Sequence, residues 1–269
     1  MRESDRSIES SPAAAVTRGI ELLEFLARSH GPLSLADLAK GIGAARSSTR
    51  NVCIALEAGG LIQRTDGGYL LGWRLVELGG AHLSSFDQIR EFYRACSESP
   101  LLGHELVQVA VLEGSTDVLY VARHEGRAPL QLSAGFGDRF PAALTAVGQA
   151  LLALLGDREL GHRFSDTRVF EAGTQWRVRN LEQLVVRLGE VRARGYAVDH
   201  GGVHPAVTGI AAAVPGPGVP RFAVGVSLIG IRADGEDLAQ YGKAVRTMAA
   251  QMALPTGRMS RAPRLQRPT

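Results

Sequence analysis

The chain has 269 residues and a mass of 28.6 kDa, which suggests two domains at the usual size of about 100–200 residues each. Hydrophobic residues make up 45% and charged residues 21%, a globular composition that excludes a mainly disordered chain. Two cysteines exclude a disulfide scaffold and a multi-cysteine metal cluster, and they fit a reducing cytoplasm. No run reaches the roughly 18 apolar residues of a membrane span, and the polar N-terminus is unlike a secretory signal.

The net charge of +3 and the pI of about 9.1 do not by themselves indicate nucleic-acid binding. The tail beyond Leu254 carries four arginines and no acidic residue, so the rest of the chain is slightly acidic. The first 72 residues hold as many basic as acidic side chains. Any DNA-binding surface must therefore come from the local placement of charge.

Three helices and a hairpin are predicted in the first 72 residues, an order that is typical of a winged helix-turn-helix. Ser34 is placed to cap the second helix, and Asp66-Gly67-Gly68 is a strong turn signal. The alternative is a small helical subdomain of an enzyme. The helices are expected at about 16–30, 34–41 and 47–59, and the strands at 61–64 and 69–71. The buried faces are expected to carry Ile20, Leu22, Leu23, Leu26, Ala27, Leu35, Leu38, Ala39, Val52, Ala55 and Leu56.

Residues 73–86 predict a helix that is too apolar for a bare linker, and a further helix follows at 88–98. Short apolar runs of period two then alternate irregularly with helices, which favours an α+β fold with an antiparallel sheet. The strands are expected at 107–112, 118–123, 130–133, 196–198, 210–214 and 222–229. The helices are expected at 145–155, 181–194 and 235–252.

Two runs in the second half are distinctive: Thr145–Ala150 reads Thr-Ala-Val-Gly-Gln-Ala, and Arg194–Asp199 reads Arg-Gly-Tyr-Ala-Val-Asp. With segments such as Leu56–Ile62 and Gly68–Leu75, they resemble the IclR (isocitrate lyase regulator) family of bacterial transcription factors. The resemblance covers about residues 15–254. It implies a dimer or tetramer with an N-terminal winged helix-turn-helix and a C-terminal GAF-like effector-binding domain.

The sequence therefore predicts a ligand-responsive, cytoplasmic DNA-binding regulator of a catabolic or metabolic operon. Its expected partners are double-stranded operator DNA, a small organic effector and further copies of itself, with no membrane, cofactor or metal. Because catalytic motifs such as Gly-x-Ser-x-Gly and His-Glu-x-x-His are absent from the sequence, no enzyme activity is expected. The alternative is a DNA-binding oligomer whose second domain only assembles subunits. The expected divisions are a flexible arm at 1–14, the winged helix-turn-helix at 15–72, a linker helix at 73–86, the effector-binding domain at 87–254 and a basic flexible tail at 255–269.

The start of the third predicted helix is the candidate DNA-reading surface, because this helix enters the major groove in helix-turn-helix proteins. Hydroxyl groups there donate to phosphates, arginine pairs with guanine and asparagine with adenine. The alternative is N-capping by Ser47 on a solvated helix. Arg64 in the wing is placed to reach a phosphate. The predicted contacts are Arg46, Ser47, Ser48, Thr49, Arg50, Asn51 and Arg64.

Family members usually carry arginine at the position of Asn51, and lysine or proline near Arg46. The resemblance therefore implies that the basic reading role has moved to Arg46 and Arg50.

The resemblance also implies an effector pocket lined by Ala134, Gly135, Asp199, Gly209 and Ser227. The family often has cysteine at the position of Gly209 and a second serine at that of Ile229. These departures predict an effector that is more apolar than the shortest oxoacids. The acidic side chain of Asp199 repels a carboxylate and accepts from a hydroxyl or amino group, which favours such a group on an aromatic or branched body. The alternatives are that Asp199 caps a turn and that Ser227 is satisfied by backbone.

His200 and His204 have the i, i+4 spacing of some metal sites. The glycines at 201–202 and Pro205 argue against the helix that this spacing needs, so no metal is predicted. Cys53 is expected in the core of the first domain. A redox role for Cys96 is left open.

Overall fold

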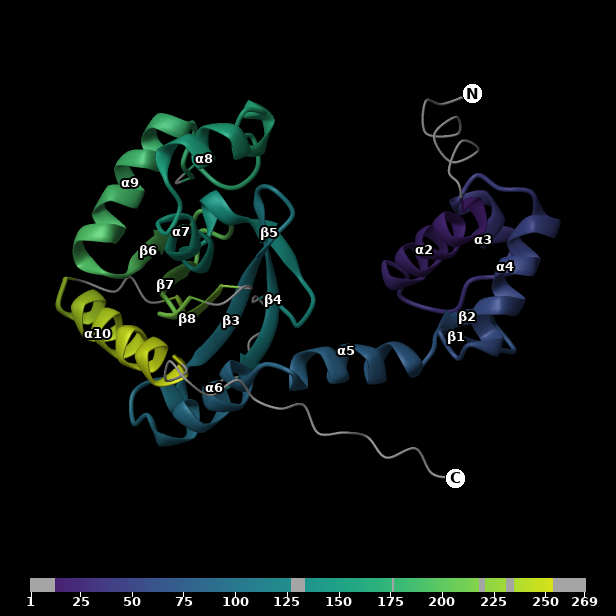
Figure 1. The fold of residues 1–269 in the computed structure, drawn as a ribbon, viewed down its shortest axis with the longest axis horizontal. Coiled ribbons are helices and arrows are strands. Elements are labelled where there is room, and N and C mark those ends of the chain that lie inside the picture. The colour runs from purple at the N-terminus through teal and green to yellow at the C-terminus, as the bar shows by residue number, and fades with distance from the viewer. Residues whose placement is uncertain (1–12, 127–133, 176, 218–220, 231–234, 254–269) are drawn as a thin grey trace. The chain divides into compact units, whose positions relative to one another are not determined.

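The computed structural model describes residues 13–126, 134–175, 177–217, 221–230 and 235–253. The chain divides into two compact units, Met1–Leu83 and Ser84–Thr269. Both units combine helices with antiparallel strands (Figure 1), so the predicted α+β class is confirmed. Residues 1–12 of the predicted arm, the basic tail and the strand predicted at 130–133 lie outside the described residues. No helix in the described part of the chain is long and apolar enough to cross a bilayer.

The first unit contains the three helices and the hairpin that the sequence predicts. The second helix begins with a capping box: the Asp37 N–H donates to Ser34 Oγ, and the Ser34 N–H donates to Asp37 Oδ2, both at 3.2 Å. The strands pair antiparallel, with Ile62 opposite Leu71. The elements are α2 (Ala14–Ala27), α3 (Leu35–Gly41), α4 (Arg46–Ala58), β1 (Ile62–Thr65) and β2 (Gly68–Leu71).

A small apolar core holds the first unit together, and the buried stripes of its helices are narrower than the apolar pattern suggests. Ile20 is 54% exposed, and Ala27 and Ala55 are exposed as well, so these three predictions are wrong. A three-helix unit is too small to cover every apolar position of each helix. The buried core consists of Leu22, Leu26, Leu38, Val52, Cys53, Ile62 and Tyr69.

The helix predicted after the wing is present as α5 (Arg74–Ser84). None of its residues is buried. Val76 is 63% exposed and Leu78 is 50% exposed, and Trp73 just before the helix is 74% exposed. The apolar side of this helix is therefore open to a partner.

The second unit is built on a six-stranded sheet in the order β5-β4-β3-β8-β7-β6, and each neighbouring pair is antiparallel. The strands are β3 (Leu106–Glu113), β4 (Asp117–His124), β5 (Arg139–Pro141), β6 (Ala197–His200), β7 (Val207–Ala213) and β8 (Phe222–Ile229). The helices are α6 (Asp87–Glu98), α7 (Ala146–Leu152), α8 (Asp157–Arg163), α9 (Leu181–Arg194) and α10 (Gly235–Met252). The sequence did not predict β5 or α8, and α7 ends three residues before the predicted end.

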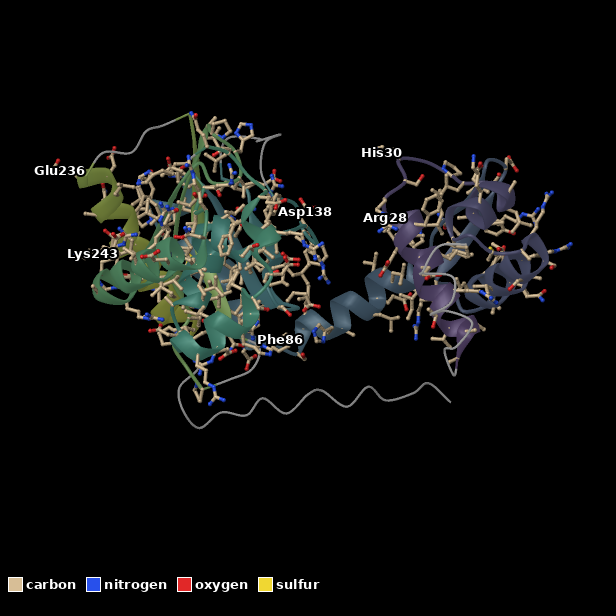
Figure 2. All side chains as sticks on the ribbon, turned by 90° about the horizontal axis from the view of Figure 1, so that it is seen from above. Arg28, His30, Phe86, Asp138, Glu236 and Lys243 are labelled. Carbon is tan, nitrogen blue, oxygen red and sulfur yellow. The ribbon has the colours of Figure 1, made fainter. Side chains whose placement is uncertain are left out.

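Helices cover both faces of this sheet, which explains the almost continuous burial along β3 and β8. Figure 1 shows α7 on one side of the sheet, with α6 and α10 on the other. Helix α7 approaches the strands closely because Gly225 carries no side chain. A Cβ there would lie 2.9 Å from both Val147 Cγ1 and Ala211 Cβ. At the start of α6, Phe86 (labelled in Figure 2) packs edge-on against Phe222, with ring centroids 5.4 Å apart.

The capping box predicts a local effect of Ser34→Ala. Loss of an N-cap side chain costs ~1 kcal/mol, so amide hydrogen exchange in α3 is expected to accelerate about fivefold. Hydrogen–deuterium exchange on the full chain measures this rate, with α9 as the internal reference. Ser34→Thr keeps the hydroxyl and is expected to exchange at nearly the wild-type rate. Equal rates in Ser34→Ala and the wild type would show that the cap does not stabilise α3.

Candidate functional site

Helix α4 presents the predicted DNA contacts. It begins at Arg46, after Ala45, and no side chain caps it. Ser47 therefore lies inside the first turn, and the alternative that Ser47 caps the helix is wrong. Arg46, Ser47, Arg50 and Asn51 are all exposed. The start of α4 thus offers two guanidinium groups, a hydroxyl and an amide to a ligand.

Two of the predicted contacts have partners inside the protein. Thr49 is fully buried, and its hydroxyl donates to the Ala45 carbonyl at 3.1 Å. It lies on the core side of α4 and cannot reach a phosphate, so that assignment is wrong. Ser48 is half-buried, and its Oγ accepts a hydrogen bond from Arg18 Nη1 of α2 at 3.1 Å. The remaining predicted contact, Arg64, is exposed on β1, with its guanidinium carbon 5.8 Å from the Tyr69 ring centroid.

The second unit contains a cavity of about 310 Å³ between the sheet and the start of α7. This volume is at the lower end of the usual range for small-molecule sites. The apolar lining residues are Ala134, Phe140, Ala146, Val147, Val203, Val207, Ile210 and Val226. Gly209, Gly225 and the polar residues Gln108, Tyr120, Thr145, Asp199, His204 and Ser227 complete the lining.

The sheet register brings three predicted effector residues into one row. Asp199 on β6 pairs with Gly209 on β7, which pairs with Ser227 on β8. Ala134 also lines the cavity, whereas Gly135 does not. The Gly135 N–H instead donates to Asp138 Oδ2 at 2.6 Å (Asp138 is labelled in Figure 2).

Asp199 is the acidic group of the cavity and is only 6% exposed. Its Oδ1 accepts a hydrogen bond from the Gly202 N–H at 2.7 Å. Burial raises the pKa of this carboxyl to about 7, although the Gly202 N–H and the positive charge of Arg187 act in the opposite direction. Near neutral pH the side chain is therefore present both as a carboxylate that accepts hydrogen bonds and as an acid that donates one.

Ser227 is held by a side chain that the sequence analysis missed. Its hydroxyl donates to Gln108 Oε1 at 3.1 Å, and Gln108 Nε2 donates to the Ala134 carbonyl at 2.6 Å. The alternative that backbone satisfies Ser227 is therefore not supported. Gln108 is the single amide in the apolar run at 107–112, and this interruption was an available signal.

Tyr120 and Thr145 were also missed. Burial raises the pKa of the Tyr120 hydroxyl, and the negative charge of Asp199 raises it further, so Tyr120 stays protonated. Thr145 caps α7 by accepting a hydrogen bond from the Gly148 N–H at 3.1 Å. Tyr120 belongs to an apolar strand, and Thr145 stands at the start of a helix. In the sequence these structural roles explain both residues, so nothing there indicates that they also line a cavity.

The position of Gly209 leaves space in the cavity. A Cβ there would lie 3.2 Å from Ala146 Cβ, so a larger residue would fill the region between β7 and α7. Ile229 does not line the cavity. Of the two differences from the family pattern, glycine at 209 therefore changes the cavity directly, whereas isoleucine at 229 does not.

The two histidines are separated: His204 lines the cavity and His200 is exposed. The residues that the structure describes contain no group of three or more potential metal-binding side chains. Cys96 is fully buried, and burial raises its pKa to about 12. A buried thiol with this pKa stays protonated, which argues against a redox role for Cys96.

Comparison with known proteins identifies both units. Residues 82–254 match the family described as bacterial transcriptional regulator IclR C-terminal, and residues 15–66 match the IclR helix-turn-helix domain. Among curated relatives, the chain is 26% identical over 187 residues to the HTH-type transcriptional regulator XynR of Escherichia coli K12, covering 69% of this chain and 73% of XynR.

Two solved structures extend the likeness over most of the chain. The Agobacterium tumefaciens repressor BlcR is 29% identical, with a TM-score of 0.57 and coverage of 91% of this chain and 97% of BlcR. An IclR homologue from Microbacterium hydrocarbonoxydans, crystallised with 4-hydroxybenzoate, has a TM-score of 0.74 at 22% identity and covers 88% of this chain and 97% of its own. The chain therefore belongs to the IclR family of bacterial transcriptional regulators, whose helix-turn-helix domain binds DNA.

Proposed function

We propose that this regulator reads operator DNA with the exposed side of α4 and binds a small organic effector in the cavity beneath α7. The observation that carries the effector proposal is the convergence of Ala134, Asp199, Gly209 and Ser227, which are far apart in sequence, on one cavity. A protein with this role acts in the bacterial cytoplasm, where its operator lies.

The lining favours an effector with a hydroxyl or amino group on an aromatic or branched body. Most of the wall is apolar, and none of the described lining residues is lysine or arginine. A bare dicarboxylate would therefore enter an apolar cavity without a countercharge, which is unfavourable. Asp199 and Ser227 offer hydrogen bonds at one side of that wall. An uncharged donor group matches them better.

The effector acts by population shift in this proposal. A ligand that binds one arrangement of the subunits better than another changes the spacing of the two winged helices on DNA. The effect on DNA affinity is limited by the ligand's differential affinity, typically ~1–3 kcal/mol. In the alternative, the second unit only assembles subunits, and no compound that fills the cavity changes DNA affinity.

Self-association completes the proposal, and α5 is the candidate contact. The helix buries none of its residues, and its apolar side carries Leu75, Val76, Leu78 and Leu83. A helix with such a stripe is usually covered by another element. A second copy of the same helix would cover it in a symmetric dimer.

The effector proposal is tested by isothermal titration of the full chain with glyoxylate, pyruvate, 4-hydroxybenzoate and other hydroxylated aromatic acids. The hydroxylated aromatic compounds are expected to bind more tightly than the two oxoacids. The affinity of a compound that donates to Asp199 should rise about tenfold from pH 6 to pH 8, because protonation of a carboxyl with a pKa of about 7 removes the acceptor. Tight binding of glyoxylate alone would contradict the size argument.

Two matched variants test whether Asp199 causes the predicted rise in ligand affinity from pH 6 to pH 8. The groups that face Asp199 are the Gly202 N–H, Arg187 and Tyr120, and His204 also lines the cavity. Asp199→Asn should remove the rise in affinity, whereas His204→Gln should keep it. An affinity that falls from pH 6 to pH 8 would instead indicate a ligand carboxylate that accepts from protonated Asp199. Unchanged binding in both Asp199→Asn and Ser227→Ala would exclude this site.

Arg50→Ala is expected to weaken specific DNA binding by about 5- to 150-fold. A bidentate arginine–base contact is worth ~1–3 kcal/mol, and Arg50 is exposed within the part of α4 that enters the groove. Fluorescence anisotropy with a duplex selected from a random library, and with an unrelated duplex, measures both affinities. An equal loss on the two duplexes would make Arg50 a phosphate contact and remove the base-reading assignment.

Val76→Asp is expected to shift the full chain toward monomer in sedimentation velocity, because it places a charge on the apolar side of α5. Val186→Asp on α9 is the matched control, since Val186 is also 63% exposed but lies on another helix. The same sedimentation profile for Val76→Asp and the wild type would count against α5 as the contact.

A further inference from the structure

We propose that Ile54 on α4 reads the C5-methyl group of a thymine in the major groove, an inference that rests on the proposed placement of α4 in DNA. Neither the resemblance nor the pattern of polar residues in α4 assigns this side chain a role.

The helix geometry places Ile54 with the reading residues. Ser47, Arg50, Asn51 and Ile54 have the spacing i, i+3, i+4, i+7 and share one side of α4. All four are exposed, whereas Thr49, Val52 and Cys53 on the opposite side are buried. At 1.5 Å per residue, the exposed side extends over roughly 10 Å along the helix axis, about the rise of three base pairs at ~3.4 Å each.

Ile54 does not take part in the apolar core of the first unit. It is 54% exposed and belongs neither to the buried core nor to the partly buried residues packed around it. A β-branched residue is also a weaker helix former than alanine, leucine or lysine. Helix formation and packing therefore give no reason for isoleucine at this position.

The chemistry of the groove supplies a reason. The thymine methyl is the apolar group that the major groove presents, and apolar side chains recognise it by contact. The polar neighbours on the same side of α4 match the other base edges, since arginine pairs with guanine and asparagine with adenine. Ile54 lies one turn beyond Arg50, at i+4, so its contact would fall on a neighbouring base pair. The side chain also has few rotamers, which limits the entropy lost on contact.

The experiment removes single methyl groups from DNA. A high-affinity duplex is first selected from a random library with the wild-type full chain. Each thymine is then replaced singly by deoxyuridine, which differs only in lacking the C5-methyl group. Affinities for the thymine and deoxyuridine duplexes are measured for the wild type, Ile54→Ala, Arg50→Ala and Ile20→Ala. Ile20 is the matched control, because it is the same residue with the same 54% exposure on α2.

In the wild type, deoxyuridine at one position in each half-site is expected to weaken binding roughly fourfold, the effect of one buried methyl group. Ile54→Ala should bind the two duplexes equally, while Arg50→Ala and Ile20→Ala keep the fourfold ratio. A wild-type protein that does not distinguish thymine from deoxyuridine would overturn the inference. So would an Ile54→Ala variant that keeps the ratio.

Three outcomes distinguish a failure of this inference from a failure of the proposed DNA surface on which it rests. If Ile54→Ala changes the sedimentation profile but not the thymine-to-deoxyuridine ratio, Ile54 is a subunit contact and the inference is wrong. If neither Arg50→Ala nor Ile54→Ala weakens specific binding, α4 does not read bases. The proposed DNA surface is then wrong, and the methyl contact is wrong with it. A normal Arg50 effect with an unchanged Ile54 ratio would overturn the methyl contact alone.

Discussion

Burial of both faces of the central sheet is the constraint that determines where the second unit can bind a ligand. Strands in such a sheet are almost entirely apolar, and a polar side chain on them needs a partner inside the protein. Gln108, Asp199 and Ser227 are such exceptions, and each has a partner within hydrogen-bond distance. They come from three different strands, yet all line the same cavity. A buried sheet with polar groups concentrated at one place is therefore shaped for a small ligand.

Burial of the Asp199 carboxyl also lowers the stability of the ligand-free protein near neutral pH. Its pKa is raised to about 7 in the folded chain from an ordinary value of 3.8, so between these pH values the folded state holds a proton that the unfolded state has released. Its contribution to stability is therefore least unfavourable below pH 4 and becomes more unfavourable as the pH rises to about 7. A bound donor would satisfy the carboxylate and offset this penalty. In the proposed effector site, stability and ligand binding are thus linked through Asp199.

Elements with clear end signals were predicted well, whereas β5 and α8, which are short and lack such signals, were missed. The observed bounds of α9, α10 and β8 equal the predicted ones, and α9 is capped by Asn180 and ends at Gly195 with φ +81°. Helix α8 has seven residues, one buried side chain and no side-chain cap, so it leaves little periodicity to detect. Gln108 was missed as a cavity residue because its partner Ser227 lies on the neighbouring strand β8, over a hundred residues away in the sequence.

The balanced charge of the first unit affects how it must recognise DNA. Attraction to phosphates is the sequence-independent part of DNA affinity, and it grows with the number of cations placed along the backbone. The first 72 residues have no excess of positive charge, Thr49 is buried, and Arg18 is directed to Ser48. Contacts to base edges must then carry a larger share of the binding free energy than in a strongly basic domain. If α4 reads DNA as proposed, the polar and apolar side chains on its exposed side decide both where this protein binds and how tightly.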